Sequence, residues 1–307
     1  MVLRLVEVVA LSRQYVKLCD IRDFEDRELL RMIRSLIPER DPLAHVERKV
    51  WEFGMCMLFM REARLLDHRT RVLSIGAGDE RLLFWLANRV GRIVATDIYG
   101  SGRFASNEAS VSMLENPRAH APYPYREDRL QVHWMDARRL TFPSDSFDVV
   151  FTISSIEHFG SGRDVARAAS EIGRVLKPGG YAVIITDCLV RRHPLDATPA
   201  GFVARLLSGG RRSRGARPFR RGMLAETFTP RELRSRIVRP SGLKFVQPIN
   251  LTLSRETWGT IQSAGVGPSE LIDGDGPYPR ILVRAGRSVL TSVCLVLCKP
   301  SDAEQLP

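Results

Sequence analysis

The sequence has few cysteines and no long apolar run. Five cysteines occur in 307 residues, without a C-x-x-C pair, a disulfide framework or a metal-ligand spacing. This excludes a disulfide-rich secreted scaffold and predicts reduced thiols in a cytoplasmic protein without a metal centre. The N-terminal stretch is interrupted by Arg4, Glu7, Arg13 and Lys17. No segment therefore reaches the roughly 18 apolar residues that a membrane span needs.

Lysine is also scarce, although the chain is basic. The net charge is +11, yet there are only five lysines and every other basic residue is arginine, a skew that a GC-rich genome can produce. Basicity alone is therefore weak evidence for a nucleic acid partner. The Arg-rich stretch 191–221 could grip a phosphate, a carboxylate or a nucleic acid backbone. Phe202 and Phe219 are its only aromatic residues, so a solvated loop is favoured over a base-stacking surface.

Strands and helices alternate from residue 71 onward. Residues 1 to about 70 are predicted to be mostly helical, and His133 is expected to be a packed core histidine within a strand. Near-continuous apolar strands joined by helices predict an α/β fold with a mostly parallel sheet covered on both faces. The expected strands are residues 71–76, 92–97, 130–136, 147–154, 181–187, 242–249 and 288–300.

The first strand leads into a glycine turn that is edged with carboxylates. Gly76 and Gly78 are present, but a dinucleotide fingerprint would have a third glycine where this chain has Arg81. A pyrophosphate would also meet like charge at Asp79 and Glu80, which disfavours a nicotinamide-dependent oxidoreductase. S-adenosylmethionine has a cationic sulfonium, an ammonium group and no phosphate. The turn therefore indicates this ligand.

Two further carboxylates close the next strands. Asp97 follows the glycine turn by about twenty residues, where a carboxylate can accept both ribose hydroxyls. Asp136 closes the third strand and could accept the adenine amino group. Each could instead cap a helix or turn. Because both carboxylates stand at the ends of successive strands, like the glycine turn, we expect them to line a single crevice that binds a nucleoside.

Four segments together resemble the class I S-adenosylmethionine-dependent methyltransferases that act on small molecules. They are "VLSIGAGDE", "VATDIY", "MDARRLTFPSDSFDVVFTISSIEHF" and "EIGRVLKPGGYAVIITD". The resemblance is strong over 70–190 and weak over 223–300. It implies a Rossmann-like seven-stranded sheet of order 3-2-1-4-5-7-6, with helices on both faces and the last strand antiparallel. It also implies S-adenosylmethionine as cofactor, with these contacts: Gly76, Ala77 and Gly78 to the methionine end, Asp97 and Ile98 to the ribose, and Asp136 and Ala137 to adenine.

The chain departs from the family pattern at two positions. The family often has an acidic residue before the glycine turn, where this chain has Ser74, and a glycine where it has Glu80. We hypothesise that Glu80 takes over part of the contact to the cofactor's ammonium group. The alternative is that Glu80 only favours the helix N-terminus.

The densest polar cluster near the expected reaction site follows the fourth strand. Ser154 and Ser155 are predicted to border the cofactor, and Glu157 and His158 are the catalytic candidates. His158 is preferred as general base because imidazole titrates near neutrality. The alternative is that Glu157 and His158 orient their loop.

A helix near residue 50 is expected to cover the cofactor. Lys49, Trp51 and Glu52 could contact its methionine end, with packing against the core favoured for Trp51.

These observations predict an N-terminal helical addition, 1–70, and a methyltransferase domain, 71–307. Insertions near 189–226 and 251–287 are expected to form an acceptor cap. The expected activity is O-methylation of a small-molecule acceptor, a saccharide or a secondary metabolite. Alternatives are an RNA methyltransferase and a non-catalytic partner protein that binds S-adenosylmethionine. The sequence leaves a homodimer open.

Overall fold

A mixed β-sheet runs through the computed structural model, which describes residues 11–192, 226–263 and 278–301. The order of its strands is β4-β3-β2-β5-β6-β10-β9-β8, and β1 and β7 also pair with β10. Strands β4, β3, β2, β5 and β6 are parallel to one another, whereas β10 is antiparallel to β6. The strands are β1 (Lys17–Leu18), β2 (Arg71–Ile75), β3 (Arg92–Asp97), β4 (Leu130–Trp134), β5 (Phe147–Ile153), β6 (Leu176–Arg191), β7 (Lys244–Phe245), β8 (Ile261–Ser263), β9 (Leu282–Ala285) and β10 (Ser288–Cys298).

The α/β fold class predicted from the sequence is confirmed. The seven expected strands correspond to β4-β3-β2-β5-β6-β10-β7, in the order that the resemblance implies. Strands β1, β8 and β9 were not predicted, because two to four residues are too few to show periodicity. Strands β7, β1 and β9 pair in succession with the outer edge of β10, an 11-residue strand, and β8 pairs with β9.

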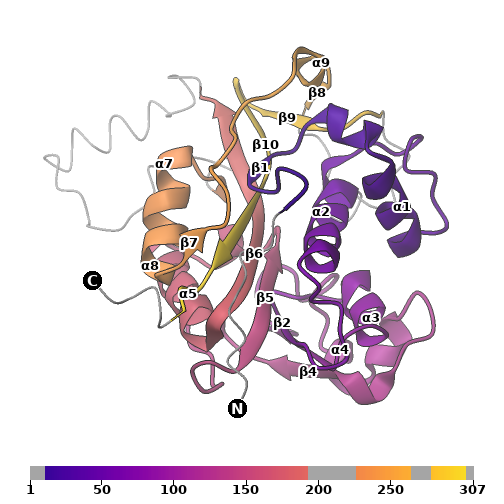
Figure 1. The fold of residues 1–307 in the computed structure, drawn as a ribbon, viewed down its shortest axis with the longest axis vertical. Helices are drawn as coiled ribbons and strands as arrows, with labels where there is room; N and C mark the ends of the chain where they lie inside the picture. Colours follow the sequence, from indigo (N-terminus) through magenta and orange to yellow (C-terminus); the bar gives the residue numbers. More distant parts are fainter. Residues whose placement is uncertain (1–10, 193–225, 264–277, 302–307) are drawn as a thin grey trace, which may run out of the picture.

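Helices cover both faces of this sheet (Figure 1). One side carries α5, α7 and α8, and the other carries α1, α2 and α3. Helix α2 is buried along nearly its whole length, as its apolar surface predicts. No helix in the described ranges is long and apolar enough to cross a membrane. The helices are α1 (Arg27–Leu36), α2 (Arg48–Glu62), α3 (Arg81–Ala87), α4 (Ser112–Glu115), α5 (Gly162–Val175), α7 (Pro230–Glu232), α8 (Arg239–Ser241), α9 (Arg255–Trp258) and a π-helical turn, Leu233–Val238, between α7 and α8.

The prediction that His133 is a packed core histidine is wrong. His133 is exposed, as is its neighbour Trp134, which is 54% exposed. The reason is that β4 is the edge strand of the sheet, where within the described residues it pairs with β3 alone. One face of β4 is therefore left open to solvent.

The close packing of α5 against Ser241, at the end of α8, requires a glycine at position 173. A Cβ atom built on Gly173 would lie 1.9 Å from the Ser241 carbonyl oxygen, whereas one on Gly162 would meet only the Arg236 guanidinium. We expect Gly173→Ala to destabilise the fold by about 1–3 kcal/mol, because backbone cannot move aside. Gly162→Ala is the control and should be near neutral, since a flexible side chain can shift. Urea unfolding measures both, and equal midpoints would contradict the packing argument.

Candidate functional site

The glycine turn after β2 is shaped by two residues with positive φ. Gly76 and Gly78 have φ angles of 64° and 49°. A Cβ atom on Gly76 would lie 2.5 Å from the Ser155 Cβ, and one on Gly78 would lie 2.8 Å from the Glu108 carbonyl oxygen. The turn is therefore packed between two neighbouring segments at a distance that only glycine permits.

Asp97, at the end of β3, braces this turn. Its Oδ2 accepts a hydrogen bond from the Gly78 amide at 2.9 Å, and its Oδ1 accepts one from the Ile98 amide at 2.7 Å. Burial raises the pKa of Asp97, and the two amides partly offset that effect. The carboxylate is thus fixed in position, and each oxygen keeps a lone pair for a ligand.

At the end of the edge strand, the Asp136 carboxylate already has a partner. Arg138 Nε donates to its Oδ1 at 2.8 Å and to its Oδ2 at 2.9 Å, and hydrogen bonds from Arg138 lower the pKa of Asp136. The neighbouring Ala137 is buried. A contact from Asp136 to adenine would therefore share a carboxylate that Arg138 orients.

Glu80 is paired with a lysine from α2. Lys49 Nζ lies 2.8 Å from Glu80 Oε1 and 3.7 Å from Glu52 Oε2. Burial raises the pKa of Glu80 to about 7, against the opposing effect of Lys49. The glycine turn is therefore flanked by a buried, mutually compensated cation and anion.

The segment after β5 forms hydrogen bonds with both the glycine turn and α2. Ser155 Oγ donates to the Gly76 carbonyl oxygen at 2.7 Å, and Ser154 Oγ donates to Glu52 Oε2 at 2.7 Å. Ser154 has a φ of 47°, an uncommon angle for a residue with a side chain. These bonds fix the segment that carries Glu157 and His158.

Glu157 and His158 have different surroundings. The buried Glu157 accepts a hydrogen bond from Thr186 Oγ1 at 2.7 Å, and burial raises its pKa. His158 Nδ1 lies 3.3 Å from Glu226 Oε2, and the Phe104 ring packs 4.9 Å from the imidazole. Glu157 thus contacts β6, whereas His158 contacts a carboxylate from beyond the Arg-rich stretch.

The Glu226 carboxylate is in turn held by Arg103. Arg103 Nη1 lies 3.0 Å from Glu226 Oε1 and 2.9 Å from Oε2. Burial opposes a charge on His158, but the hydrogen bond to Glu226 and the charges of nearby carboxylates outweigh it, so the pKa of His158 is raised. His158, Glu226 and Arg103 form a connected series of polar groups.

The residues predicted for the site in the glycine turn, at the strand ends and in the segment after β5 all line one cleft of about 1330 Å³. That volume exceeds the roughly 300–1,000 Å³ of most small-molecule pockets, which leaves room for a second ligand. Glu226, Arg280 and Val283 also line it, so both predicted cap segments contribute to its wall. The predicted roles of the site residues remain predictions. The residues that line this cleft and were predicted are Gly76, Ala77, Gly78, Glu80, Asp97, Ile98, Asp136, Ala137, Ser154, Ser155, Glu157 and His158.

Of the helical trio near residue 50, Lys49 and Glu52 line the cleft and Trp51 does not. Trp51 is fully buried, and its Nε1 donates to Asp23 Oδ2 at 2.8 Å. Sequence reasoning missed Glu47, Arg48, Asp187, Glu226 and Arg280. Asp187 ends the expected strand 181–187 and offered a signal of the kind used for Asp97. No motif or strand end marked Glu47, Arg48, Glu226 or Arg280 individually as a site residue.

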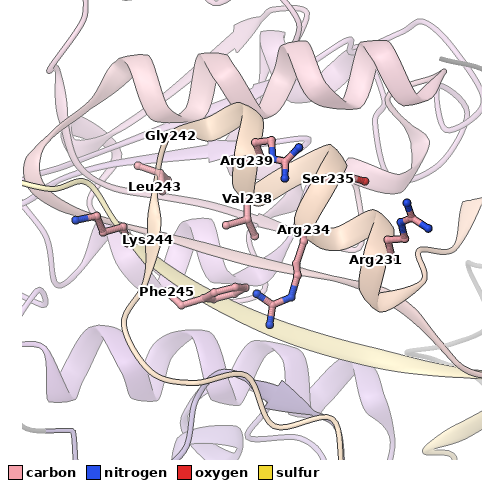
Figure 2. Close-up of a pocket in the computed structure, with 9 residues that line it drawn as sticks. All are labelled: Arg231, Arg234, Ser235, Val238, Arg239, Gly242, Leu243, Lys244 and Phe245. Carbon is pink, nitrogen blue, oxygen red and sulfur yellow. The ribbon is translucent and has the colours of Figure 1, made fainter. Parts of the chain in front are cut away.

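A second, shallower groove of about 750 Å³ lies beside β7 (Figure 2). Four cationic side chains line it, and none forms an ion pair within the described residues: Arg231, Arg234, Arg239 and Lys244. Figure 2 shows them spread along the groove without converging on a common point. The groove shares no lining residue with the cleft. The predicted Arg-rich segment 191–221 lies outside the described residues except at its start, so its role is not tested.

Comparisons with known proteins identify a methyltransferase domain within the chain. Residues 73–184 match the family described as "Methyltransferase domain". The methyltransferase GfsG of Streptomyces halstedii is 31% identical over 151 residues, which are 49% of this chain and 47% of that protein. The 27-O-demethylrifamycin SV methyltransferase of Amycolatopsis mediterranei is 30% identical over 157 residues, covering 50% and 53%. The erythromycin 3''-O-methyltransferase of Saccharopolyspora erythraea is 28% identical over 220 residues, covering 66% and 63%.

The chain spans about half the length of the first two of these relatives. The matched domain, 73–184, contains the glycine turn, the carboxylates at the strand ends and His158. The strand order around them is the one that the sequence resemblance implies. Residues 73–184 are a methyltransferase domain, and the chain has the strand order of a class I S-adenosylmethionine-dependent methyltransferase.

Proposed function

We propose that this chain transfers the methyl group of S-adenosylmethionine to a hydroxyl group of a small-molecule acceptor. The observation that carries the proposal is the pairing of His158 Nδ1 with Glu226 at 3.3 Å, in the wall of the cleft that also holds the glycine turn. A positioned imidazole in such a cleft is suited to accept a proton from a hydroxyl nucleophile.

The residues at one end of the cleft fit the cofactor. S-adenosylmethionine supplies a methyl group that is already activated on a sulfonium. Asp97 and Ile98 are proposed to bind the ribose, and Asp136 and Ala137 the adenine. The glycine turn lines the cleft through its backbone, because the space on the Cβ side of Gly76 and Gly78 is filled by Ser155 and Glu108.

Lys49 and Glu80 are proposed to bind the zwitterionic methionine end. The two charged groups, 2.8 Å apart, match an α-carboxylate and an ammonium group. This refines the hypothesis for Glu80, because Lys49 accounts for the other half of the zwitterion.

Replacing Glu80 with Gln should weaken S-adenosylmethionine binding about tenfold, because the ammonium group loses its charged partner and Lys49 loses its own. Calorimetric titration measures the dissociation constant. Glu115→Gln is the matched control, since Glu115 is exposed and does not line the cleft. Equal affinity in wild type and Glu80→Gln would remove Glu80 from the cofactor site.

His158 is the proposed general base. When Nδ1 donates to Glu226, the imidazole is held in the tautomer whose Nε2 lone pair is free to accept a proton. Phe104 packs against the ring and helps to hold its orientation, while part of the imidazole stays exposed to the cleft. Glu157 is proposed to position this loop through Thr186 rather than to act on the acceptor.

The acceptor is proposed to be a saccharide or a secondary metabolite. Two relatives carry names that specify O-methylation, of a rifamycin position and of erythromycin. The segments 189–226 and 251–287 are proposed to form the acceptor cap of a domain that begins at 71, after a helical addition, because Glu226, Arg280 and Val283 reach the cleft. The five free cysteines fit a cytoplasmic location.

The RNA alternative has less support from the cleft. The acceptor side of the cleft is lined by Glu47, Glu157, Asp187 and Glu226. Its cations Arg48 and Arg103 are already paired with the last two of these, so a run of phosphates would find little free positive charge there. The basic groove of Figure 2 is separate from the cleft.

The test begins with parallel calorimetric titrations of S-adenosylmethionine, S-adenosylhomocysteine and NAD. Micromolar binding of the first two, with no binding of NAD, is the expected result. A panel of hydroxylated small molecules is then screened for S-adenosylhomocysteine release. Binding without turnover of any acceptor would favour the non-catalytic partner protein, and NAD binding would overturn the cofactor assignment.

A further inference from the structure

The wall of the cleft beside the start of α2 is built by a contact between distant segments. Glu47 and Arg280 form an isolated parallel β-bridge. The Arg280 amide donates to the Val46 carbonyl oxygen at 2.7 Å, and the Arg48 amide donates to the Arg280 carbonyl oxygen at 3.2 Å. Two backbone hydrogen bonds therefore fix Arg280, two residues before β9, to the N-terminus of α2. The positions of both side chains are set by ordered backbone.

Both side chains are buried. The charges of Arg40 and Arg280 oppose the rise that burial causes in the pKa of Glu47, but within the described residues no hydrogen bond or ion pair holds either side chain. Arg280 is 8% exposed and lines the cleft, and within the described ranges its guanidinium makes no hydrogen bond or ion pair. Glu47 is 1% exposed, lines the same cleft, and its Oε1 has no hydrogen-bond partner. No ion pair joins the two. Buried polar groups are nearly always paired, and a buried charge without a partner is costly. An unpartnered guanidinium that faces a cleft therefore indicates a ligand.

Glu47 and Arg280 lie on the acceptor side of the cleft. In the strand order, β9 lies beyond β10, whereas Asp97 and Asp136 follow β3 and β4 at the opposite end. Arg280 adjoins Arg48, whose guanidinium donates to the Asp187 carboxylate. The negative charge of Asp187 is one of those that raise the pKa of His158. Arg280 therefore borders the half of the cleft that holds His158.

We propose that Arg280, flanked by Glu47, forms an acceptor subsite for a small molecule that bears a carboxylate in addition to its methylated hydroxyl. A guanidinium presents a planar pair of N–H donors that matches the two oxygens of a carboxylate. One unpaired cation suits one anionic group, whereas a polyanion would need several. Glu47 would accept a hydrogen bond from a neighbouring hydroxyl of the same molecule. The inference rests on the proposed function, because it concerns the acceptor of that same site.

The test compares matched acids and amides. Protein saturated with S-adenosylhomocysteine is titrated with glucuronate, glucuronamide, 4-hydroxybenzoate and 4-hydroxybenzamide, by calorimetry and thermal shift. We expect at least one acid to bind about tenfold or more tightly than its amide. Arg280→Gln should abolish that difference, and Arg280→Lys should keep part of it. Arg284→Gln is the matched control, because Arg284 is exposed on β9 and does not line the cleft.

Glu47→Gln gives a second, opposite signal. Removing a carboxylate beside the bound acid should raise its affinity about threefold to tenfold at pH 8, where Glu47, whose pKa burial raises to about 7, is ionised. A purely structural role of Arg280 would not produce this gain, nor a difference between acid and amide.

The outcomes separate the two proposals. If wild type binds S-adenosylhomocysteine but treats every acid and amide alike, the carboxylate subsite is wrong and the proposed function stands. If the acid preference persists in Arg280→Gln, another residue provides it and the assignment is overturned. Should Arg280→Gln lose S-adenosylhomocysteine binding, Arg280→Lys and Glu47→Gln decide the question. Failure of wild type to bind S-adenosylhomocysteine would overturn the proposed function, and this inference with it.

Discussion

His158→Gln is expected to lower kcat about 10²- to 10⁴-fold, the range typical of a lost general base. Glutamine can still contact Glu226 but cannot accept a proton from the acceptor. S-adenosylhomocysteine affinity should be unchanged, because the proposed contacts to ribose and adenine lie at the ends of β3 and β4, away from His158. The measurement is single-turnover methyl transfer to an acceptor identified by the screen. His133→Gln is the control, since His133 is exposed and does not line the cleft.

The same proposal predicts a pH profile. The base acts in its neutral form, and the pKa of His158 is raised above its usual value of about 6.5. The neutral fraction therefore grows as pH rises through the raised pKa, so kcat should increase with pH and level off above it. Glu226→Gln removes the hydrogen bond and charge that raise this pKa, so the profile should shift toward acid. A pH-independent kcat, or turnover of His158→Gln at the wild-type rate, would exclude His158 as the base.

The cofactor side of the cleft could be predicted from sequence because its signals are local. The glycine turn and Asp97 each follow an apolar strand, and parallel strands bring their carboxyl ends to one edge of the sheet. Spacing along the chain was therefore enough to group Gly76, Asp97 and Asp136. The strand order followed from the family resemblance.

The acceptor side could not be predicted in the same way. Glu226 and Arg280 belong to segments without periodicity, and their neighbours His158 and Glu47 are distant in sequence. Nothing local indicates which carboxylate will meet which cation. The pairing of Lys49 with Glu80 shows the same limit, because the sequence pointed to both residues but not to their ion pair. Short strands such as β1 and β9 were missed because they depend on the long edge of β10.

Asp97→Asn is expected to weaken S-adenosylmethionine and S-adenosylhomocysteine binding about 100-fold or more. Both carboxylate oxygens accept backbone hydrogen bonds, from Gly78 and Ile98. Asparagine has one acceptor oxygen, so its amide NH₂ would face one of these N–H donors and leave it unsatisfied, at a cost of about 1–3 kcal/mol. The ribose also loses a charged acceptor. Since each 1.4 kcal/mol is about tenfold in affinity, the two losses together exceed 100-fold.

Calorimetry of both ligands tests this prediction, and the thermal midpoint of the free protein separates its two causes. If the turn itself opens, Asp97→Asn lowers the midpoint without ligand; if only the ribose contact is lost, the midpoint stays and the ligand-induced rise shrinks. Asp128→Asn is the matched control, because Asp128 is exposed and does not line the cleft. Wild-type affinity in Asp97→Asn would mean that the ribose binds elsewhere, and the glycine turn would then need another role. A loss of affinity in Asp97→Asn but not in Asp128→Asn would show that cofactor binding depends on the carboxylate that accepts hydrogen bonds from the turn.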